Sequence, residues 1–282
     1  MQKRTIGVVG AGTMGNGIAQ AFAVAGVNVI MSDIAEAAVQ RGLATISGSL
    51  DRLIKKEKLT ADEKTAALAR ITTTTDVKAL ANCDLIVEAA TENLDLKIKI
   101  FKQLDELASP ATVLASNTSS ISITKLAAAT QRPDKVIGMH FFNPVPMMAL
   151  VELIRGLQTA DSTYAVAEEM TRAVGKTPVQ IKNSPGFVVN RMLCPMINEA
   201  IFALGEGLAT AAEIDEAMKL GANHPIGPLA LADLIGLDVQ LAVMQVLFEG
   251  FKDPKYRPAP LLVEMVEAGY LGRKTGRGFF TY

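Results

Sequence analysis

One histidine and one glutamate have the right setting for acid–base chemistry. The segment Val136–Ile154 opens with a short apolar strand that delivers His140 at its end. It continues through a loop with two prolines into a second apolar run that contains Glu152. A carboxylate on an apolar run is costly to bury unless it is paired. The loop can fold the second run back beside the first, and a histidine held by a carboxylate is a general base with a fixed tautomer. The competing interpretation is a core histidine and an unrelated edge-strand glutamate.

A second set of residues has the spacing of a dinucleotide-binding turn. Thr5–Val9 is apolar and β-branched, as expected for a buried strand, and is followed at once by Gly10-Ala11-Gly12-Thr13-Met14-Gly15. In this GxGxxG pattern, the first glycine allows a tight turn and the second lets a pyrophosphate approach the backbone. The third lets the next helix pack on the strand. A strand at Val27–Met31 then leads to Asp33, whose carboxylate is placed for the ribose hydroxyls of an adenosine. Asp33 would repel a 2′-phosphate, so the pattern predicts NAD rather than NADP. The alternative is a glycine-rich turn with a solvated aspartate.

A helical hairpin is expected to interrupt the alternation of strands and helices. Ala35–Lys58 has a helical pattern, and Thr60 with Glu63 has the spacing of a capping box that starts another helix. The next strand is predicted at Ile71–Thr74. The end of the first helix is basic, with Arg52, Lys55, Lys56 and Lys58. The sequence alone favours a solvated helix end stabilised by the helix dipole, and the alternative is a grip on a phosphate-bearing substrate.

Polar residues follow two more predicted buried strands. Asp84–Glu88 is followed by Glu92 and by a helix that is expected to begin at Lys97. The strand Thr112–Ala115 leads to Ser116-Asn117-Thr118-Ser119-Ser120. Polar side chains just beyond the carboxyl ends of parallel strands lie where open α/β sheets bind ligands. The alternative is a helix N-cap, and one serine can cap while another faces a ligand.

The turn Asn183-Ser184-Pro185-Gly186 is the best domain boundary, because strand patterns disappear after it. We therefore predict an α/β fold with a Rossmann-type doubly wound sheet and the inserted helical hairpin over residues 1–184. An all-helical domain is predicted over residues 185–282. Its first long helix carries Asn190 near its start, off the apolar stripe. Further helices are expected at Thr210–Leu220, Leu229–Phe248 and Pro260–Ala268.

The end of the chain is basic and rich in glycine. Residues 272–282 offer Lys274 to a cofactor or, alternatively, form a flexible end. The helical region is very apolar for its length, so part of it is expected to face another subunit.

Composition excludes several classes of protein. The 282 residues carry a net charge of −1, which argues against a general nucleic-acid binder. Two distant cysteines and two histidines argue against a disulfide framework and against a metal site, and they fit a reducing compartment. No apolar run approaches the length of a membrane span, so a cytoplasmic location is expected.

The motifs together resemble the 3-hydroxyacyl-CoA dehydrogenase family, in particular its short bacterial members that act on 3-hydroxybutyryl-CoA. The matching segments run in the family's order over almost the whole chain: GAGTMGNGIAQ, VEAATEN, ASNTSSISIT, GMHFFNPVPMMALVELI, NSPGFVVNR, HPIGPLALAD and GRKTGRGFF. The resemblance implies interconversion of an (S)-3-hydroxyacyl-CoA and a 3-ketoacyl-CoA with NAD. It also implies a homodimer through the helical domain.

The resemblance assigns roles to individual residues. His140 is the expected base, Glu152 orients it, Ser119 contacts the substrate oxygen, and Asn190 helps to place substrate and histidine. The expected cofactor contacts, besides the glycine-rich turn, are Asp33, Glu92, Lys97, Ser119, Asn143 and Lys274. The expected coenzyme A contacts are Ser49, Lys56 and Ser119, so the basic helix end gains a functional interpretation.

Two alternatives remain open. One is a related dehydrogenase of free hydroxy acids or sugar acids, against which the aromatic pair beside His140 and the basic hairpin argue. The other is a dinucleotide-binding protein without catalysis, against which the complete set of His140, Glu152, Ser119 and Asn190 argues.

Overall fold

The computed structural model describes residues 4–282. The chain divides into two compact units, Met1–Asn183 and Ser184–Tyr282. The division falls one residue before the boundary that was predicted from the turn at Asn183–Gly186. Residues 1–3 of the predicted first domain lie outside the described residues.

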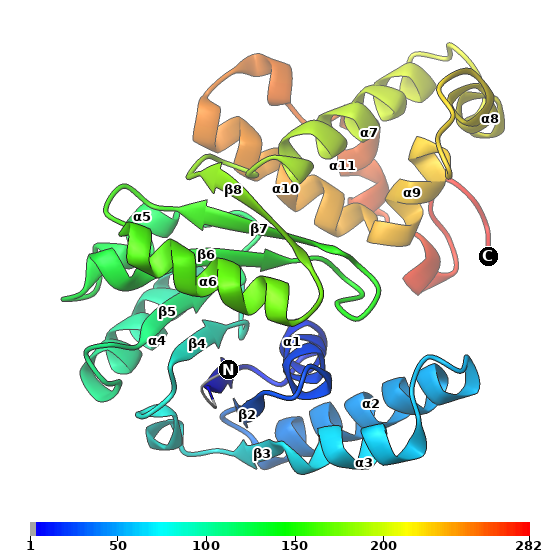
Figure 1. Ribbon diagram of the computed structural model, residues 1–282. Coiled ribbons are helices and arrows are strands. Elements are labelled where there is room, and N and C mark those ends of the chain that lie inside the picture. Colours follow the sequence, from blue (N-terminus) through cyan, green and yellow to red (C-terminus); the bar gives the residue numbers. More distant parts are fainter. Residues whose placement is uncertain (1–3) are drawn as a thin grey trace. The chain divides into compact units, whose positions relative to one another are not determined.

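The first unit is built on one eight-stranded sheet (Figure 1). Its strands, in chain order, are β1 Thr5–Val9, β2 Asn28–Ser32, β3 Ile71–Thr74, β4 Leu85–Glu88, β5 Val113–Ser116, β6 Val136–Phe141, β7 Leu150–Arg155 and β8 Thr177–Lys182. Their order in the sheet is β3-β2-β1-β4-β5-β6-β7-β8, and every neighbouring pair is parallel except the antiparallel pair β6–β7. The chain reverses direction across the sheet after β3, which confirms the doubly wound prediction.

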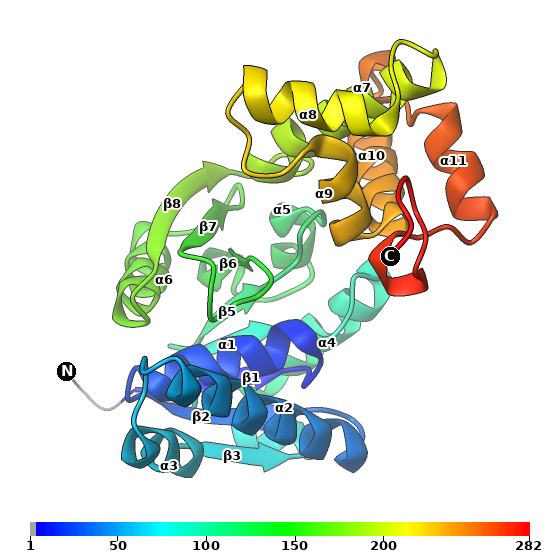
Figure 2. The ribbon, with the colours of Figure 1, turned by 90° about the vertical axis from the view of Figure 1, so that its right-hand side faces the viewer.

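Helices connect these strands and lie on both faces of the sheet (Figure 1). They are α1 Thr13–Val24, α2 Glu36–Lys55, α3 Ala61–Ala69, α4 Leu94–Leu107, α5 Ile123–Ala127 and α6 Asp161–Ala173, with short 3₁₀ turns at Val77–Leu80 and Pro133–Lys135. The predicted hairpin is confirmed as α2 and α3, which lie beside β3 at one edge of the sheet (Figure 2). The predicted capping box is also present, because the Glu63 amide donates to Thr60 Oγ1 and the Thr60 amide donates to Glu63 Oε2.

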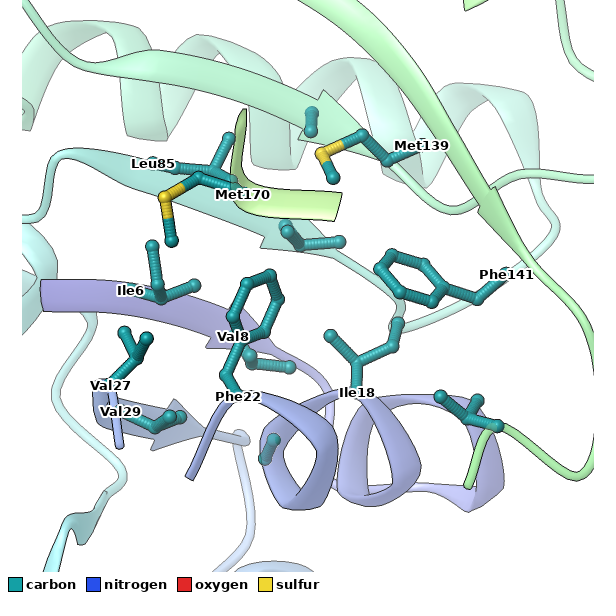
Figure 3. Close-up of a cluster of buried hydrophobic side chains, with 14 of the residues drawn as sticks. Ile6, Val8, Ile18, Phe22, Val27, Val29, Leu85, Met139, Phe141 and Met170 are labelled. Atoms are coloured by element: carbon teal, nitrogen blue, oxygen red, sulfur yellow. The ribbon is translucent and has the colours of Figure 1, made fainter. Parts of the chain in front are cut away.

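A continuous apolar core joins α1 to the sheet (Figure 3). Ile18 and Phe22 of α1 are fully buried against strand residues such as Val8. The ring of Phe22 meets that of Phe141 on β6 edge to face, with 6.5 Å between centroids. Such pairs add about 0.5–1.5 kcal/mol beyond area burial. The helix that follows the glycine-rich turn is therefore packed directly on the strand that carries His140.

The second unit is helical, as predicted. Its elements are α7 Val189–Gly205, α8 Ala211–Gly221, α9 Pro228–Ile235, α10 Leu237–Phe251 and α11 Pro260–Glu267, with 3₁₀ turns at Pro254–Tyr256 and Arg273–Thr275. The prediction of one helix over Leu229–Phe248 is wrong, because α9 and α10 meet at an angle of 98°. Gly236 lies between them with φ 103°, a conformation that glycine adopts readily and that ends α9.

The interpretation of the chain's end as flexible is also wrong. Asp233 on α9 is 1% exposed, and its carboxylate accepts hydrogen bonds from the amides of Phe279 and Phe280 and from the Tyr282 hydroxyl. Isolated bridges also pair Arg277 with Gly272 and with Thr281. Residues 272–282 therefore fold around one buried carboxylate.

Within residues 4–282, no single helix has both the length and the apolar composition that a membrane crossing needs. The α9–α10 pair meets that test only as two helices bent by 98°.

Asp233→Ala should unfold the second unit more easily, because three donors lose a buried charged acceptor. We expect the free energy of unfolding to fall by about 2–3 kcal/mol. Denaturant unfolding followed by tyrosine fluorescence measures it, since Tyr256, Tyr270 and Tyr282 lie in this unit and only Tyr164 lies in the other. Glu199→Ala, an exposed carboxylate on α7, is the matched control. Equal midpoints for both variants would contradict the anchoring role of Asp233.

Candidate active site

The antiparallel pair β6–β7 brings the predicted histidine and glutamate together. His140 and Glu152 are direct cross-strand partners, and His140 Nδ1 lies 2.7 Å from Glu152 Oε2. The expectation that the proline loop folds the second run back beside the first is therefore confirmed. His140 lies inside β6 rather than just after the strand.

Burial makes this pair electrostatically demanding. Glu152 is 1% exposed and His140 is 6% exposed. A buried carboxylate needs a hydrogen-bonding partner, and the neutral imidazole satisfies it by donating its Nδ1 proton. That bond places the proton of the neutral tautomer on Nδ1. The ring of Phe142 lies 4.4 Å from the imidazole between centroids and limits its rotation.

Asn117 is a site residue that the pattern of the sequence did not single out. It follows β5, and its side-chain Oδ1 accepts the Phe141 amide at 2.9 Å. The backbone amide of Asn117 donates to the Glu88 carbonyl at 2.8 Å. Asn117 thereby ties the end of β6, next to His140, to the end of β4. The polar run that contains it was the available signal.

The glycine-rich turn has the shape that a bound pyrophosphate requires. A Cβ on Gly15 would lie 1.8 Å from the Gly10 carbonyl oxygen, and Gly10 has φ 100°. A Cβ on Gly12 would meet no atom within 4 Å, so the backbone at Gly12 faces open space. Asp33 Oδ2 accepts the Ala11 amide at 2.8 Å, which joins the predicted ribose-binding carboxylate to the turn. These residues fit a dinucleotide.

Glu92 collects the hydroxyl groups that follow β5. Its Oε1 accepts hydrogen bonds from Thr118 Oγ1 at 2.7 Å, from Ser119 Oγ at 3.0 Å and from Ser120 Oγ at 2.9 Å. The Ser119 amide also donates to this oxygen, at 2.8 Å. The structure thus brings together Glu92 and Ser119, which were predicted separately.

Lys97 lies close to Glu92 and pairs with a second, buried carboxylate. It is 1% exposed, and its Nζ lies 2.5 Å from Glu88 Oε2 and 3.8 Å from Glu92 Oε2. Glu88 is fully buried and also accepts the Ser116 hydroxyl at 2.9 Å. Helix α4 begins at Leu94, three residues before the predicted start, with Asn93 as its N-cap. Glu88 was read only as part of a strand, and no local pattern reveals its partner.

The remaining predicted residues lie on other elements. Asn143 is exposed in the β6–β7 loop. Ser49 is half-buried on α2, and Lys56 is exposed at the C-terminal cap of that helix. Asn190 lies in the first turn of α7, and Lys274 forms an ion pair with Asp238; both belong to the second unit.

Thiol chemistry is disfavoured by burial. Cys83 and Cys194 are buried, and burial raises the pKa of each thiol to about 12. Over residues 4–282, no three side chains of His, Cys, Asp or Glu are grouped to hold a metal ion.

Lys97→Met should destabilise the first unit, because it leaves Glu88 buried without its countercharge. Loss of one partner of a buried pair costs about 3–5 kcal/mol of unfolding free energy. The double variant with Glu88→Gln should recover most of this loss, because glutamine still accepts the Ala90 amide that Glu88 Oε1 accepts at 2.9 Å. Denaturation followed by circular dichroism measures both. Equal losses in the single and double variants would show that the missing countercharge is not the cause.

Comparisons with known proteins agree on one family. The model of the 3-hydroxyacyl-CoA dehydrogenase NAD-binding domain matches residues 5–184, and the model of the C-terminal domain of the same enzymes matches residues 186–282. The 3-hydroxybutyryl-CoA dehydrogenase of Bradyrhizobium diazoefficiens is 53% identical over 99% of this chain and 95% of its own length. The enzyme of the same name from Clostridioides difficile is 52% identical over 98% of this chain and 99% of its own length.

A solved structure gives the same result. The crystal structure of (S)-3-hydroxybutyryl-CoA dehydrogenase from Ralstonia eutropha superposes with a TM-score of 0.97 at 67% identity, covering 100% of this chain and 99% of that one. The first unit is thus an NAD-binding domain, and the chain belongs to the 3-hydroxyacyl-CoA dehydrogenase family.

Proposed function

We propose that this protein interconverts (S)-3-hydroxybutyryl-CoA and acetoacetyl-CoA with NAD(H). The observation that carries the proposal is the buried His140–Glu152 pair with its 2.7 Å contact, in a chain that belongs to this family. Its relatives from Bradyrhizobium and Clostridioides, which it matches over 95% and 99% of their length, are named 3-hydroxybutyryl-CoA dehydrogenase.

His140 is the proposed general base and acid. In the oxidative direction, its Nε2 accepts the proton of the substrate's 3-hydroxyl group while the Nδ1–H bond to Glu152 persists. Bound NAD⁺ supplies the acceptor for the hydride that leaves C3. The imidazolium that forms faces the Glu152 carboxylate, which stabilises its charge. In the reductive direction, the same Nε2 proton polarises the ketone and is transferred to it.

Ser119 and Asn190 are the proposed substrate-positioning groups. The Ser119 hydroxyl donates to Glu92 at 3.0 Å, so its oxygen can accept a hydrogen bond from the substrate's hydroxyl. Asn190 has an amide that can both donate and accept, which suits a role in placing substrate and histidine. Positioning of this kind converts binding energy into a reactive geometry.

The cofactor and coenzyme A contacts follow from the same proposal. The glycine-rich turn holds the pyrophosphate and Asp33 takes the ribose hydroxyls, which favours NAD over NADP. Glu92, Lys97, Ser119, Asn143 and Lys274 are further proposed cofactor contacts. Ser49, Lys56 and Ser119 are the proposed coenzyme A contacts, and the exposed ammonium group of Lys56 suits a phosphate.

A homodimer through the second unit and a cytoplasmic location belong to the proposal as well. The unit exposes large apolar side chains, with Met192 at 71%, Leu208 at 78% and Leu220 at 77%. Contiguous apolar patches mark interaction sites, and in the proposed dimer such side chains are covered by the partner subunit. Light scattering after size exclusion tests the dimer, and a monomer at micromolar concentration would contradict it.

The activity is tested by NADH consumption with acetoacetyl-CoA, beside NADPH and beside free acetoacetate. Fast turnover only with the combination of NADH and acetoacetyl-CoA supports the proposal, including the binding of the coenzyme A moiety. Comparable turnover of free acetoacetate would favour a dehydrogenase of free hydroxy acids. NADH binding without turnover of the thioester would indicate a binding protein.

His140→Ala should lower turnover of acetoacetyl-CoA by roughly 10²–10⁴-fold, because the proton donor is lost. The dissociation constant of NADH should stay near the parent value, since the cofactor fold does not depend on the imidazole. Stopped assays and fluorescence titration with NADH measure the two quantities. Unchanged turnover of acetoacetyl-CoA in this variant would contradict the proposed role of His140.

Glu152→Gln should keep the fold and still lower turnover, because an amide can accept the Nδ1–H bond without stabilising the imidazolium. A hydrogen bond to a charged group is worth about 1.5–3 kcal/mol, which corresponds to a loss of roughly 10- to 100-fold. Turnover and the thermal midpoint should be measured on the same preparation. If the variant kept both the turnover rate and the thermal midpoint of the parent protein, the charge of the Glu152 carboxylate would have no role in turnover.

A further inference from the structure

A buried lysine outside the proposed contacts holds the loop between the two active-site strands. Lys176, immediately before β8, is 9% exposed. Its Nζ donates to the backbone carbonyls of Val145 and Met148, at 2.5 Å each. Among residues 4–282, no carboxylate lies within 4.0 Å of this ammonium group. Burial lowers the pKa of Lys176. A long cationic side chain buried against carbonyl groups alone is costly, so its placement calls for a role.

The β6–β7 loop has few backbone donors of its own. Pro144 and Pro146 lack an amide proton. The Met147 and Met148 amides both donate to the Pro144 carbonyl, at 2.9 and 3.1 Å, and form its turn. The Ala149 carbonyl accepts the Thr177 amide at 2.7 Å, which leads the chain into β7. Lys176 supplies donors to two carbonyls in the middle of the loop, so one side chain holds the loop at two points.

The other side of the loop rests on the cofactor helix. Val145 is 2% exposed, and a Cβ on Gly17 of α1 would lie 2.9 Å from Val145 Cβ. The loop therefore packs directly on α1, two residues beyond Gly15 of the glycine-rich turn. It starts at Phe142, just after β6 with His140, and ends at β7 with Glu152. Lys176 thus binds a loop that connects the strands of His140 and Glu152 and packs on α1, the helix after the glycine-rich turn.

We propose that Lys176 is a positioning residue, which fixes the β6–β7 loop and thereby the distance between His140 and the nicotinamide end of the cofactor. This inference rests on the proposed function. The hydrogen bonds do not depend on the charge, because a neutral amine still has two N–H donors for the two carbonyls. The loop's geometry is therefore kept in either protonation state.

A purely structural lysine would have different consequences. If Lys176 only stabilised the end of the sheet, its loss would lower the thermal midpoint and leave the rate of the folded enzyme unchanged. A positioning lysine affects the rate of the folded enzyme, because displacement of reacting groups by about 1 Å can cost 10²-fold in rate.

The test compares Lys176→Met, which removes the donors at similar length, with Lys176→Arg, which keeps them. Lys182→Met is the matched control, because Lys182 is exposed at the far end of β8, the strand that Lys176 immediately precedes. We expect Lys176→Met to lower kcat with acetoacetyl-CoA and NADH by about 10- to 100-fold below its melting range, with the KM for acetoacetyl-CoA changed by less than about 3-fold. Lys176→Arg should recover at least part of kcat, and Lys182→Met should match the parent.

Amide exchange reports on the loop without any turnover. In Lys176→Met, deuterium uptake should rise in peptides that cover residues 143–149, where the Met147 and Met148 amides form the turn. Gly17→Ala approaches the loop from the opposite side, since the added methyl group must displace Val145. It should also lower kcat and increase uptake, and it provides the test if Lys176→Met does not fold.

The results separate the inference from the proposed function. A parent protein that is inactive on acetoacetyl-CoA contradicts the function, while exchange in the loop still reports on Lys176. Parent kcat in Lys176→Met, or in Gly17→Ala where the methionine variant is unfolded, overturns the positioning role. Unchanged deuterium uptake across residues 143–149 overturns it as well.

Discussion

The burial of one carboxylate constrains the catalytic half of the sheet. Glu152 is 1% exposed on β7, and a carboxylate at such a position costs several kcal/mol unless it is paired. His140 pairs with it only in one register of β6 and β7, in which the two residues face each other across the strands. A slip by one residue would turn Glu152 to the other face of the sheet. The desolvation of Glu152 and the position of His140 therefore depend on each other.

The antiparallel direction of β7 makes this register attainable. A parallel neighbour of β6 needs a crossover helix, whereas an antiparallel neighbour needs only a loop. That loop, residues 142–149, stays close to the histidine and contacts α1 through Val145. The contact between Phe22 and Phe141 joins the same two elements from within the core. The cofactor helix and the histidine strand are thus connected twice, by an aromatic pair and by a loop that Lys176 holds.

The features that could be predicted from the sequence depend on residues that lie close together along the chain. The strand, glycine turn and helix from Thr5 onward, and the capping box at Thr60, need only local spacing, and the structure confirms them. The pairing of His140 with Glu152 was within reach because the loop between them is short. The Glu88–Lys97 pair, the Asp233 anchor for Phe279 and the clamp from Lys176 to Val145 were not predicted. Each joins elements whose adjacency follows from strand order or helix packing, over separations of 9, 46 and 31 residues.

The break at Gly236 has a different origin. A periodic apolar pattern runs through it, and a single glycine is tolerated in a helix at a cost of about 1 kcal/mol. In the bent arrangement, α9 packs against α7 and α8, and these contacts lie outside the local pattern of the sequence. The roles of Asn190 and Lys274, which both belong to the second unit, stay predictions, because each role depends on a bound ligand.

Three acids of the first unit are stabilised in three different ways. Glu88 has a buried ammonium group, Glu92 has hydroxyl groups and an amide, and Glu152 has an imidazole. Ammonium groups and hydroxyls keep their protonation near neutral pH, whereas an imidazole changes its own. In the proposed reaction, only the Glu152 pair therefore changes its charge during turnover. The contacts of Glu88 and Glu92 hold the segments that follow β4 and β5, and the proposed reaction routes no proton through them. The acid that supports proton transfer is thus held on β7, apart from the two acids that hold the polar segments beyond β4 and β5.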